Sequence, residues 1–370
     1  MEQALRCRAS TLPKARARAR RLGLRGAAFP WRTIAGEECS GYLPAGTAAF
    51  HINADLAHAV VSYVAATGDE RFEREAGAEL LVETARLWMS LGYHDERRGG
   101  RFSIDGVTGP DEYSVLVDNN LYTNLMAQMT IPYDPELGIH LQDEDFARHA
   151  PFDFEGTPPE RYPLLLHVPY FELYRRQVVK QPDLVLAIAL HGNAITAEEK
   201  RRNLAYYEAL TVRDSSLAAG TQTVLAAEVG DVQLAYDYLA EAALLDHHDI
   251  HRNTADGLHL AALAGAWHAV IAGLAGARQH GGRLAFAPRL PQPLRRIAFP
   301  LAFQRRRLRV EITPDRATYT LVAGTALELE HWGTPLVALP DSPTVAPIPA
   351  PVPVPPLRQP PGRAPRRRRP

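Results

Sequence analysis

The sequence predicts a mainly α-helical fold, followed by a small antiparallel β-sheet domain and a disordered tail rich in proline and arginine. Three observations support this prediction. Apolar residues recur at helical spacing between positions 50 and 280, alternating and β-branched residues follow after about position 283, and prolines crowd the C-terminus. The expected boundaries are 1–282 for the helical domain, 283–339 for the β-sheet domain and 340–370 for the tail.

The helical domain is expected to begin with a basic helix. Residues 1–25 are rich in arginine and poor in acids, as in a transit peptide. We interpret them as part of the domain, because Leu22-Gly23-Leu24 leads into Phe29-Pro30-Trp31 without a break typical of a cleavage site. The next predicted helix, at 54–67, carries apolar residues at helical spacing.

Short Gly-Asp turns are expected to join the helices in pairs. Gly68 ends one helix and Asp69 is suited to cap the next, and Gly230 and Asp231 repeat this order. A further predicted helix at 257–274 is rich in alanine and glycine, which permits close packing. These pairs predict an array of helical hairpins. Since no fixed repeat period is visible, a closed toroid is favoured over a solenoid.

The last two regions differ in composition. Strands are expected at 301–303, 307–313, 318–322 and 326–332, where residues alternate or are β-branched. The arginines between positions 305 and 309 are interpreted as a solvated strand face rather than a nucleic-acid site. Residues 341–370 hold eleven of the 30 prolines and six arginines, and we assign the tail no function.

Composition narrows the class of protein. The chain has 370 residues, 46% of them hydrophobic, and a formal net charge of −1. Its two cysteines, Cys7 and Cys39, are too few for a disulfide framework, so a cytoplasmic protein is expected. No apolar run approaches eighteen residues, so we expect no membrane segment. Neither a nucleic acid nor a membrane is predicted as a partner.

The segment Gly109-Pro110-Asp111-Glu112-Tyr113 is the strongest candidate for a site. Gly-Pro predicts a turn that presents two carboxyl groups at its exit, and either could be a proton donor. Amides and hydroxyls fill residues 118–124, where a solvated turn would be followed by an apolar run. We expect these polar groups to line a sugar site.

Four further segments are unlike ordinary packing, and they are the following: Lys180-Gln181 before an apolar helix at 184–190, Arg213-Asp214-Ser215-Ser216, Asn253-Thr254 with Gly257-Leu258-His259, and Phe29-Pro30-Trp31. The second precedes a helical run, where free N–H groups favour an anion such as phosphate. An ordinary Asp or Ser cap is the commoner explanation. The histidines at 247, 248 and 251 lack the spacing of a zinc site, so no metal is predicted.

Several segments occur in the same order in a known family. Between about Arg6 and Leu339 the chain resembles the C-terminal portion of glycoside hydrolase family 65, the inverting α-glucoside phosphorylases that act on maltose, trehalose, kojibiose and similar disaccharides. The resemblance rests on these segments: Thr11-Leu12-Pro13-Lys14-Ala15-Arg16, Gly26 to Trp31, His51-Ile52-Asn53-Ala54-Asp55, Gly109 to Tyr113, Val117 to Asn124, Lys180-Gln181, Tyr206-Tyr207-Glu208, Asp214-Ser215-Ser216-Leu217, Ala227 to Asp231, and Asn253 to Gly265.

The resemblance implies an (α/α)6 toroid followed by a small β-sheet domain. It also implies site residues: Glu112 as the general acid, Lys180 and Gln181 as ligands of the glucosyl unit, and Ser215, Ser216 and His259 as a phosphate cradle. Phosphate would attack the anomeric carbon from the face opposite Glu112 and give β-glucose 1-phosphate, so phosphate is a co-substrate and no cofactor is expected. Glu112 must hold a proton near neutral pH, through burial or a neighbouring carboxylate such as Asp111.

The chain departs from the family in two ways. It has Ser114-Val115 where members generally carry His-Glu, and it starts after the family's β-sandwich domain and Trp-Asp segment. We therefore expect a toroid that lacks its first helices, little activity of the chain alone, and either a homodimer or a complementing N-terminal fragment. Two alternatives remain, namely a hydrolase or transferase on the same scaffold and a non-catalytic helical binding protein.

Overall fold

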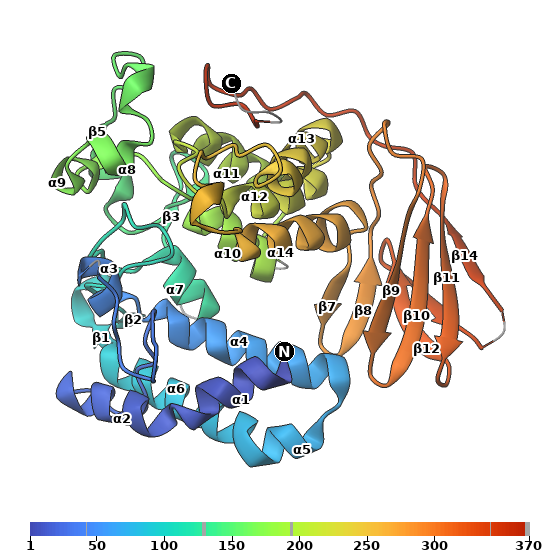
Figure 1. Cartoon of the computed structure of the whole chain (residues 1–370), viewed down its shortest axis with the longest axis horizontal. Helices are drawn as coiled ribbons and strands as arrows, with labels where there is room; N and C mark the ends of the chain where they lie inside the picture. Colours follow the sequence, from blue (N-terminus) through green and yellow to red (C-terminus); the bar gives the residue numbers. More distant parts are fainter. Residues whose placement is uncertain (42, 128–130, 193–194, 341, 367–370) are drawn as a thin grey trace. The chain divides into compact units, whose positions relative to one another are not determined.

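A computed structural model describes the chain except residues 42, 128–130, 193–194, 341 and 367–370 (Figure 1). The chain forms two compact units. Unit 1 comprises Met1–Val64, Asp69–Ala194 and Leu210–Asp214, and unit 2 comprises Ala65–Gly68, Ile195–Ala209 and Ser215–Pro370. Each unit is described separately below.

Unit 1 is built mainly from helices. The longer ones are α1 (Glu2–Ser10), α2 (Leu12–Arg21), α4 (His51–Thr67), α6 (Ala78–Leu91) and α10 (Asp183–His191). Shorter elements are α3 (Leu43–Ala48), α5 (Glu70–Phe72), α7 (Leu121–Met126), α8 (Leu164–His167), α9 (Tyr170–Leu173), and the strands β1 (Tyr93–Asp95), β2 (Arg101–Ser103), β3 (Tyr133–Asp134), β4 (Ile139–His140), β5 (Ala150–Pro151) and β6 (Arg176–Gln177). The predicted basic N-terminal helix is confirmed as α1 and α2.

The core of unit 1 explains why these helices form. Apolar residues from α1, α2, α4 and α6 share one cluster, which includes Leu5, Leu12, Val60 and Leu80. Phe29 is fully buried in the same cluster, so its segment serves packing, contrary to the sequence-based interpretation. The Asp69 carboxylate accepts a hydrogen bond from the N–H of Phe72 at 3.0 Å, which confirms the predicted cap.

The helices of unit 2 are α11 (Ala197–Leu210), α12 (Ala218–Glu228), α13 (Val232–Leu244) and α14 (Leu260–His268), followed by a π-helical segment, Ala269–Leu274. Asp231 caps α13 through the N–H of Leu234, as predicted. Alanine and glycine allow the expected close packing, because a Cβ added at Gly220 of α12 would lie 2.9 Å from the carbonyl oxygen of Gly265 in α14. The backbones of these helices therefore approach closely.

The strands of unit 2 are β7 (Arg278–His280), β8 (Arg283–Phe286), β9 (Ile297–Phe303), β10 (Arg306–Ile312), β11 (Arg316–Ala323), β12 (Leu327–His331), β13 (Thr334–Ala338) and β14 (Thr344–Pro347), drawn from orange to red in Figure 1. They form two four-stranded sheets, ordered β14-β11-β10-β9 and β13-β12-β8-β7. The predicted change from helix to strand near residue 283 is confirmed. One pair departs from the antiparallel prediction, since β8 and β12 are parallel.

The β-sheet core follows the alternation in the sequence. Leu308, Val310 and Ile312 of β10 are buried, whereas Arg307 and Arg309, on either side of Leu308, are exposed. Phe286 and Tyr319 belong to the same apolar cluster as these buried residues. The arginines of this strand therefore lie on a solvated face, as expected.

The C-terminal segment corrects the prediction of disorder from residue 340. Residues 344–347 form β14, which pairs with β11. Beyond it, the N–H of Leu357 donates to the Asp231 carboxylate at 2.8 Å, and the Arg363 guanidinium donates to the carbonyl oxygen of Ala209 at 2.7 Å. Proline has no N–H donor, but its carbonyl group still accepts hydrogen bonds and the residues between the prolines keep their N–H groups. A proline-rich chain can therefore still bond to a neighbouring surface.

None of the described helices is both long enough and apolar enough to cross a lipid bilayer.

Candidate active site

The Gly109–Tyr113 segment lies in a loop of unit 1 that a single β-bridge closes. Val107 and Val117 exchange backbone hydrogen bonds of 2.9 and 3.0 Å, and the loop between them carries the segment. The N–H of Ser114 donates to the carbonyl oxygen of Asp111 at 3.1 Å, which gives the predicted turn. Gly109 is required there, because a Cβ would lie 2.0 Å from Oδ2 of Asp183.

Glu112 and Lys180 meet at this loop. Nζ of Lys180 lies 2.7 Å from Oε2 of Glu112, and their side chains are only 16% and 18% exposed. Gln181 joins them, since its Nε2 donates to the carbonyl oxygen of Pro110 at 2.7 Å. The structure therefore brings together three predicted site residues that are up to 69 positions apart in the chain.

The sequence places the Asp111 carboxyl group at the exit of the turn, but the structure buries it. Asp111 points inward, where its carboxylate accepts hydrogen bonds from Nε2 of Gln142 and from the N–H of Lys180. Burial raises the pKa of Asp111 to about 7, although these hydrogen bonds oppose the shift. The charged group in contact with the Glu112 carboxylate is thus an ammonium and not a second carboxylate.

The polar residues 118–124 form an internal network. Asn120 caps α7 by accepting from the N–H of Thr123 at 2.9 Å, and its own Nδ2 reaches the Asp183 carboxylate at 3.1 Å. Asn124 donates to Oδ1 of Asn119 at 3.2 Å. Asn120, Thr123 and Asn124 are buried, so their hydrogen bonds serve the interior, whereas Asn119 borders a cavity described below. Buried amides must be hydrogen-bonded, and here they bond to one another.

Ser114 occupies one of the two positions at which the chain departs from the family. Its side chain is buried, and its Oγ accepts a hydrogen bond of 2.8 Å from Nε2 of Gln142. The substitution is therefore accommodated by a local partner beneath the loop.

The Arg213–Ser216 segment spans the end of unit 1 and the start of unit 2 in the sequence. Asp214 does not cap α12: its Oδ2 accepts from the Tyr113 hydroxyl at 2.9 Å and from the N–H of Leu164 at 2.7 Å. Burial raises the pKa of this carboxyl group. Ser215 is buried and its Oγ accepts from the N–H of Leu217 at 3.2 Å, whereas Ser216 is half-buried.

His259 lies in unit 2, immediately before α14. Its Nδ1 is 2.5 Å from Oδ1 of Asp246, and its own N–H donates to the other oxygen of that carboxylate. The hydrogen bond from His259 lowers the pKa of Asp246. Nε2 of His259 lies 3.2 Å from Nδ2 of Asn253. Asp246 fixes the ring, a role that the sequence did not reveal because the two residues are thirteen positions apart and share no motif.

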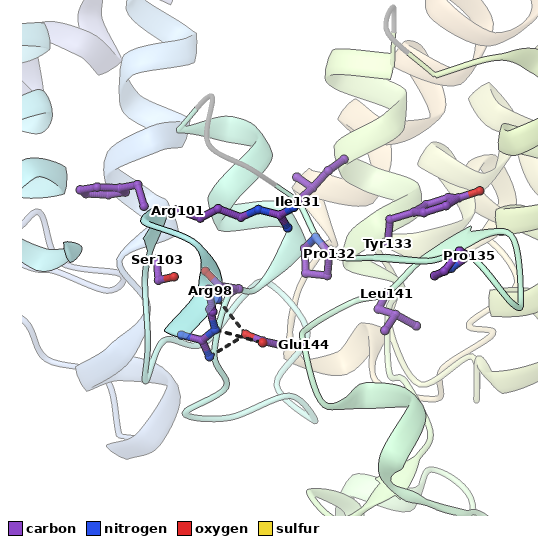
Figure 2. Close-up of a pocket in the computed structure, with 11 residues that line it drawn as sticks. Arg98, Arg101, Ser103, Ile131, Pro132, Tyr133, Pro135, Leu141 and Glu144 are labelled. Carbon is purple, nitrogen blue, oxygen red and sulfur yellow. Dashed lines mark hydrogen bonds and ion pairs between the residues drawn. The ribbon is translucent and has the colours of Figure 1, made fainter. Parts of the chain in front are cut away.

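A separate cavity of about 540 Å³ opens elsewhere in unit 1 (Figure 2). Arg98 and Glu144 form an ion pair across it, with Nε and Nη2 of Arg98 at 3.0 and 2.7 Å from the carboxylate, and Arg101 and Tyr133 also line it. Asn119, from the polar segment predicted to line a sugar site, borders this cavity, whereas Glu112, Lys180 and Gln181 do not. Within the described parts of the chain, no group of three or more histidine, cysteine or acidic side chains could hold a metal ion.

Comparison with known proteins extends the likeness to nearly the whole chain. The central catalytic domain of glycosyl hydrolase family 65 matches residues 1–133 and 127–268, and the C-terminal domain of that family matches residues 277–338. An uncharacterized glycosyl hydrolase of Mycobacterium tuberculosis is 48% identical over 99% of this chain and 51% of its own length. An alpha,alpha-trehalose phosphorylase of Geobacillus stearothermophilus is 40% identical over 90% of this chain and 49% of its own length.

A solved structure, a putative kojibiose phosphorylase from the human microbiome, is similar in fold. It covers 92% of this chain and 50% of its own length, with a TM-score of 0.84 and 25% sequence identity. This likeness confirms the predicted fold class, helices of an α/α toroid followed by a β-sheet domain. The chain spans about half the length of the curated relatives it matches. Since both its helical part and its β-sheet part match, the chain belongs to glycosyl hydrolase family 65.

Proposed function

We propose that this chain carries the catalytic residues of an inverting phosphorolysis, in which an α-linked glucose disaccharide and phosphate give β-glucose 1-phosphate and glucose. The observation that supports it most directly is the contact of Glu112 with Lys180, beside Gln181. A carboxyl group and a hydrogen-bonding cation that share a partly buried site are suited to protonate a leaving oxygen and to orient a glucosyl unit.

Glu112 is the proposed general acid. Lys180 donates to its carboxylate in the free protein, so the bound sugar must draw the ammonium toward its own hydroxyl groups before Glu112 can serve the glycosidic oxygen. Gln181, which is tied to the carbonyl oxygen of Pro110, is the second proposed ligand of the glucosyl unit. Asp111 is fully buried, so the substrate cannot reach it and it is not proposed as the proton donor.

Phosphate is the proposed nucleophile, held by Ser215, Ser216 and His259. Ser215 and Ser216 precede α12 and His259 precedes α14. Asp246 orients the His259 ring through Nδ1, so Nε2, which contacts Nδ2 of Asn253 at 3.2 Å, is the nitrogen proposed to bind phosphate in place of that amide. Phosphate is already an anion, whereas water would need a base to remove its proton. Asp111 and Asp183, the carboxylates beneath the Glu112 loop, are buried and cannot supply that base. Phosphorolysis is therefore favoured over hydrolysis.

Trehalose is the first substrate to test, because an alpha,alpha-trehalose phosphorylase is 40% identical to this chain. Maltose and kojibiose follow. Disaccharide and phosphate are thus the proposed partners, and no cofactor is required. Cys7 and Cys39 are free and exposed, which suits the reducing cytoplasm as the proposed compartment. Hydrolysis is the second candidate, because the relative from Mycobacterium tuberculosis is named a glycosyl hydrolase.

The test measures glucose and glucose 1-phosphate released from each disaccharide, with and without phosphate. The chain is assayed alone and mixed with the part of the relative from Mycobacterium tuberculosis that it does not match, since this chain matches about half of that protein. We expect little release by the chain alone and phosphate-dependent release of glucose 1-phosphate by the mixture. Release of glucose without phosphate would support hydrolysis instead, and no release under any condition would favour a non-catalytic binding protein.

Glu112→Gln should lower phosphorolysis by at least about a hundredfold, because the amide cannot donate the proton that the leaving oxygen requires. Glu172→Gln is the matched control, since Glu172 is exposed and lies outside the proposed site. Turnover by the Glu112 variant at the wild-type rate would remove Glu112 as the acid.

A further inference from the structure

Two buried aspartates, Asp111 and Asp183, lie in a closed ring of hydrogen bonds beneath the Glu112 loop. Nε2 of Gln142 donates to Oδ2 of Asp111 at 2.8 Å, and Oε1 of Gln142 accepts from the N–H of Asp183 at 3.1 Å. The N–H of Asp111 completes the ring by donating to Oδ1 of Asp183 at 2.6 Å. The ring therefore joins three segments that are distant in the sequence: the loop at 109–113, residue 142 and the start of α10.

The ring also holds the backbone on both sides of the Glu112–Lys180 contact. Oδ1 of Asp111 accepts from the N–H of Tyr113 at 3.3 Å and from the N–H of Lys180 at 3.1 Å. One carboxylate thus bonds to the residue that follows Glu112 and to Lys180 itself. The side chains of Glu112 and Lys180 project from backbone that the Asp111 carboxylate fixes, so the distance between them depends on Asp111.

Neither aspartate can touch the substrate. Asp111 is 0% exposed and Asp183 is 1% exposed. Oδ2 of Asp183 accepts from Nδ2 of Asn120, so hydrogen-bonding groups occupy both carboxylates. Burial raises the pKa of Asp183 well above its usual value, and the nearby carboxylates of Asp111 and Asp143 raise it further. Burying two carboxylates lowers the free energy of unfolding, so a purely structural role is a poor explanation for them.

We propose that Asp111 and Asp183 are positioning residues of the active site, which, with Gln142, set the separation of the Glu112 carboxylate and the Lys180 ammonium. This proposal rests on the proposed function for its catalytic consequence, but the geometry that it predicts can be tested without turnover. Loss of either aspartate should release Lys180 from Glu112 while the fold remains.

The chain allows a clean test because it contains only three lysines, Lys14, Lys180 and Lys200. Lys180 and Lys200 are matched, since each is partly buried and paired with one glutamate: their side chains are 16% and 14% exposed, and Lys200 lies 3.1 Å from Glu228. The full chain and its variants are treated with acetic anhydride, and the rate of acetylation at each lysine is measured by mass spectrometry. Lys200 serves as the internal control.

Asp111→Asn and Asp183→Asn should each raise the acetylation rate of Lys180 at least threefold and leave that of Lys200 unchanged. Asp143→Asn, at an equally buried carboxyl group that does not bond to the loop, should change neither rate. Unchanged labelling of Lys180 in both aspartate variants would overturn the proposal. An equal rise at Lys200 would also overturn it, because it would show a general loss of folding.

Turnover then separates positioning from the proposed function. In a protein that phosphorolyses disaccharide, Asp111→Asn should lower kcat by about tenfold to a hundredfold, a range expected for a displaced catalytic group, with KM changed less than threefold. A complemented wild-type mixture without activity contradicts the proposed function and leaves the labelling result to decide on positioning. An active protein in which this variant keeps its kcat contradicts the positioning role.

Discussion

Three buried carboxyl groups with raised pKa values, Asp111, Asp143 and Asp183, lie in unit 1. Asp111 and Asp183 are hydrogen-bonded through both oxygens. Asp143 differs, because its Oδ2 has no hydrogen-bond partner among the described residues. Burial raises the pKa of Asp143 to about 7. A buried carboxyl group that lacks a full set of hydrogen bonds is less readily ionised. The free energy of unfolding should therefore depend on pH through the protonation of Asp143.

Asp143→Asn should reduce the pH dependence of stability. The pKa of Asp143 is higher in the folded chain than in the unfolded chain, so the folded state binds more protons between about pH 4 and pH 7. The free energy of unfolding therefore falls as pH rises, by at most about 1.4 kcal/mol per pH unit for one group. Between pH 5 and pH 8 the wild type should lose up to about 3 kcal/mol more than the variant.

Urea denaturation at pH 5, 6, 7 and 8 measures this difference. Both proteins contain the other buried carboxyl groups, so subtracting the two curves isolates the contribution of Asp143. Parallel curves would mean that Asp143 is not protonated in the folded chain at low pH.

At the scale of elements, the ends and contacts of helices follow short sequence signals. Asp69 and Asp231 each follow a glycine with positive φ and each cap a helix, as their position predicted. The close contact of α12 and α14 has a more specific cause. Gly220 faces the backbone of Gly265, and side chains at this crossing would separate the helices.

Gly220→Ala should destabilise the chain by about 1–3 kcal/mol, because the added methyl group would lie 2.9 Å from the backbone carbonyl of Gly265 and the helices would have to move apart. Gly265→Ala is the matched control. Its Cβ would lie 3.8 Å from Cα of Gly220, an ordinary contact, so the better helix propensity of alanine should make it neutral or stabilising by up to about 1 kcal/mol. Thermal denaturation compares the two, and equal effects would contradict the close approach.

At the scale of the whole molecule, the C-terminal segment bonds to the helices of its own unit. Leu357 bonds to Asp231 at the start of α13, and the N–H of Arg366 donates to the Glu241 carboxylate of the same helix at 2.5 Å. Arg363 bonds to Ala209 of α11. Among the described residues, unit 2 therefore includes the helices α11 to α14, both four-stranded sheets and this segment, so the compact units do not follow the change from helix to strand.

Asp231→Ala should release the C-terminal segment, because it removes the acceptor of the Leu357 N–H as well as the cap of α13. Trypsin should then cleave after Arg358 and Arg363 several times faster than in the wild type. Asp69→Ala is the control: it also removes a cap and should cost about 1 kcal/mol, but it does not touch this segment. Equal cleavage rates in both variants would show that the segment does not dock at Asp231.

The sequence by itself determined the helical region, the β-sheet region and the residues around the proposed acid. Periodicity and caps are local signals, so α4, α13 and the strands near 297–331 were predictable. The family resemblance identified Glu112, Lys180 and Gln181, and the structure brings these three together. The catalytic roles assigned to them stay predictions.

Tertiary structure decided what surrounds these residues. The sequence could not show that Asp111 points inward, that residues 118–124 bond to one another, or that a proline-rich segment docks on α13. Each of these outcomes depends on a partner far away in the chain: Gln142 and Lys180 for Asp111, Asp183 for Asn120, and Asp231 for Leu357. A buried polar group must be hydrogen-bonded, but its sequence neighbourhood does not determine which distant group folding will bring to it.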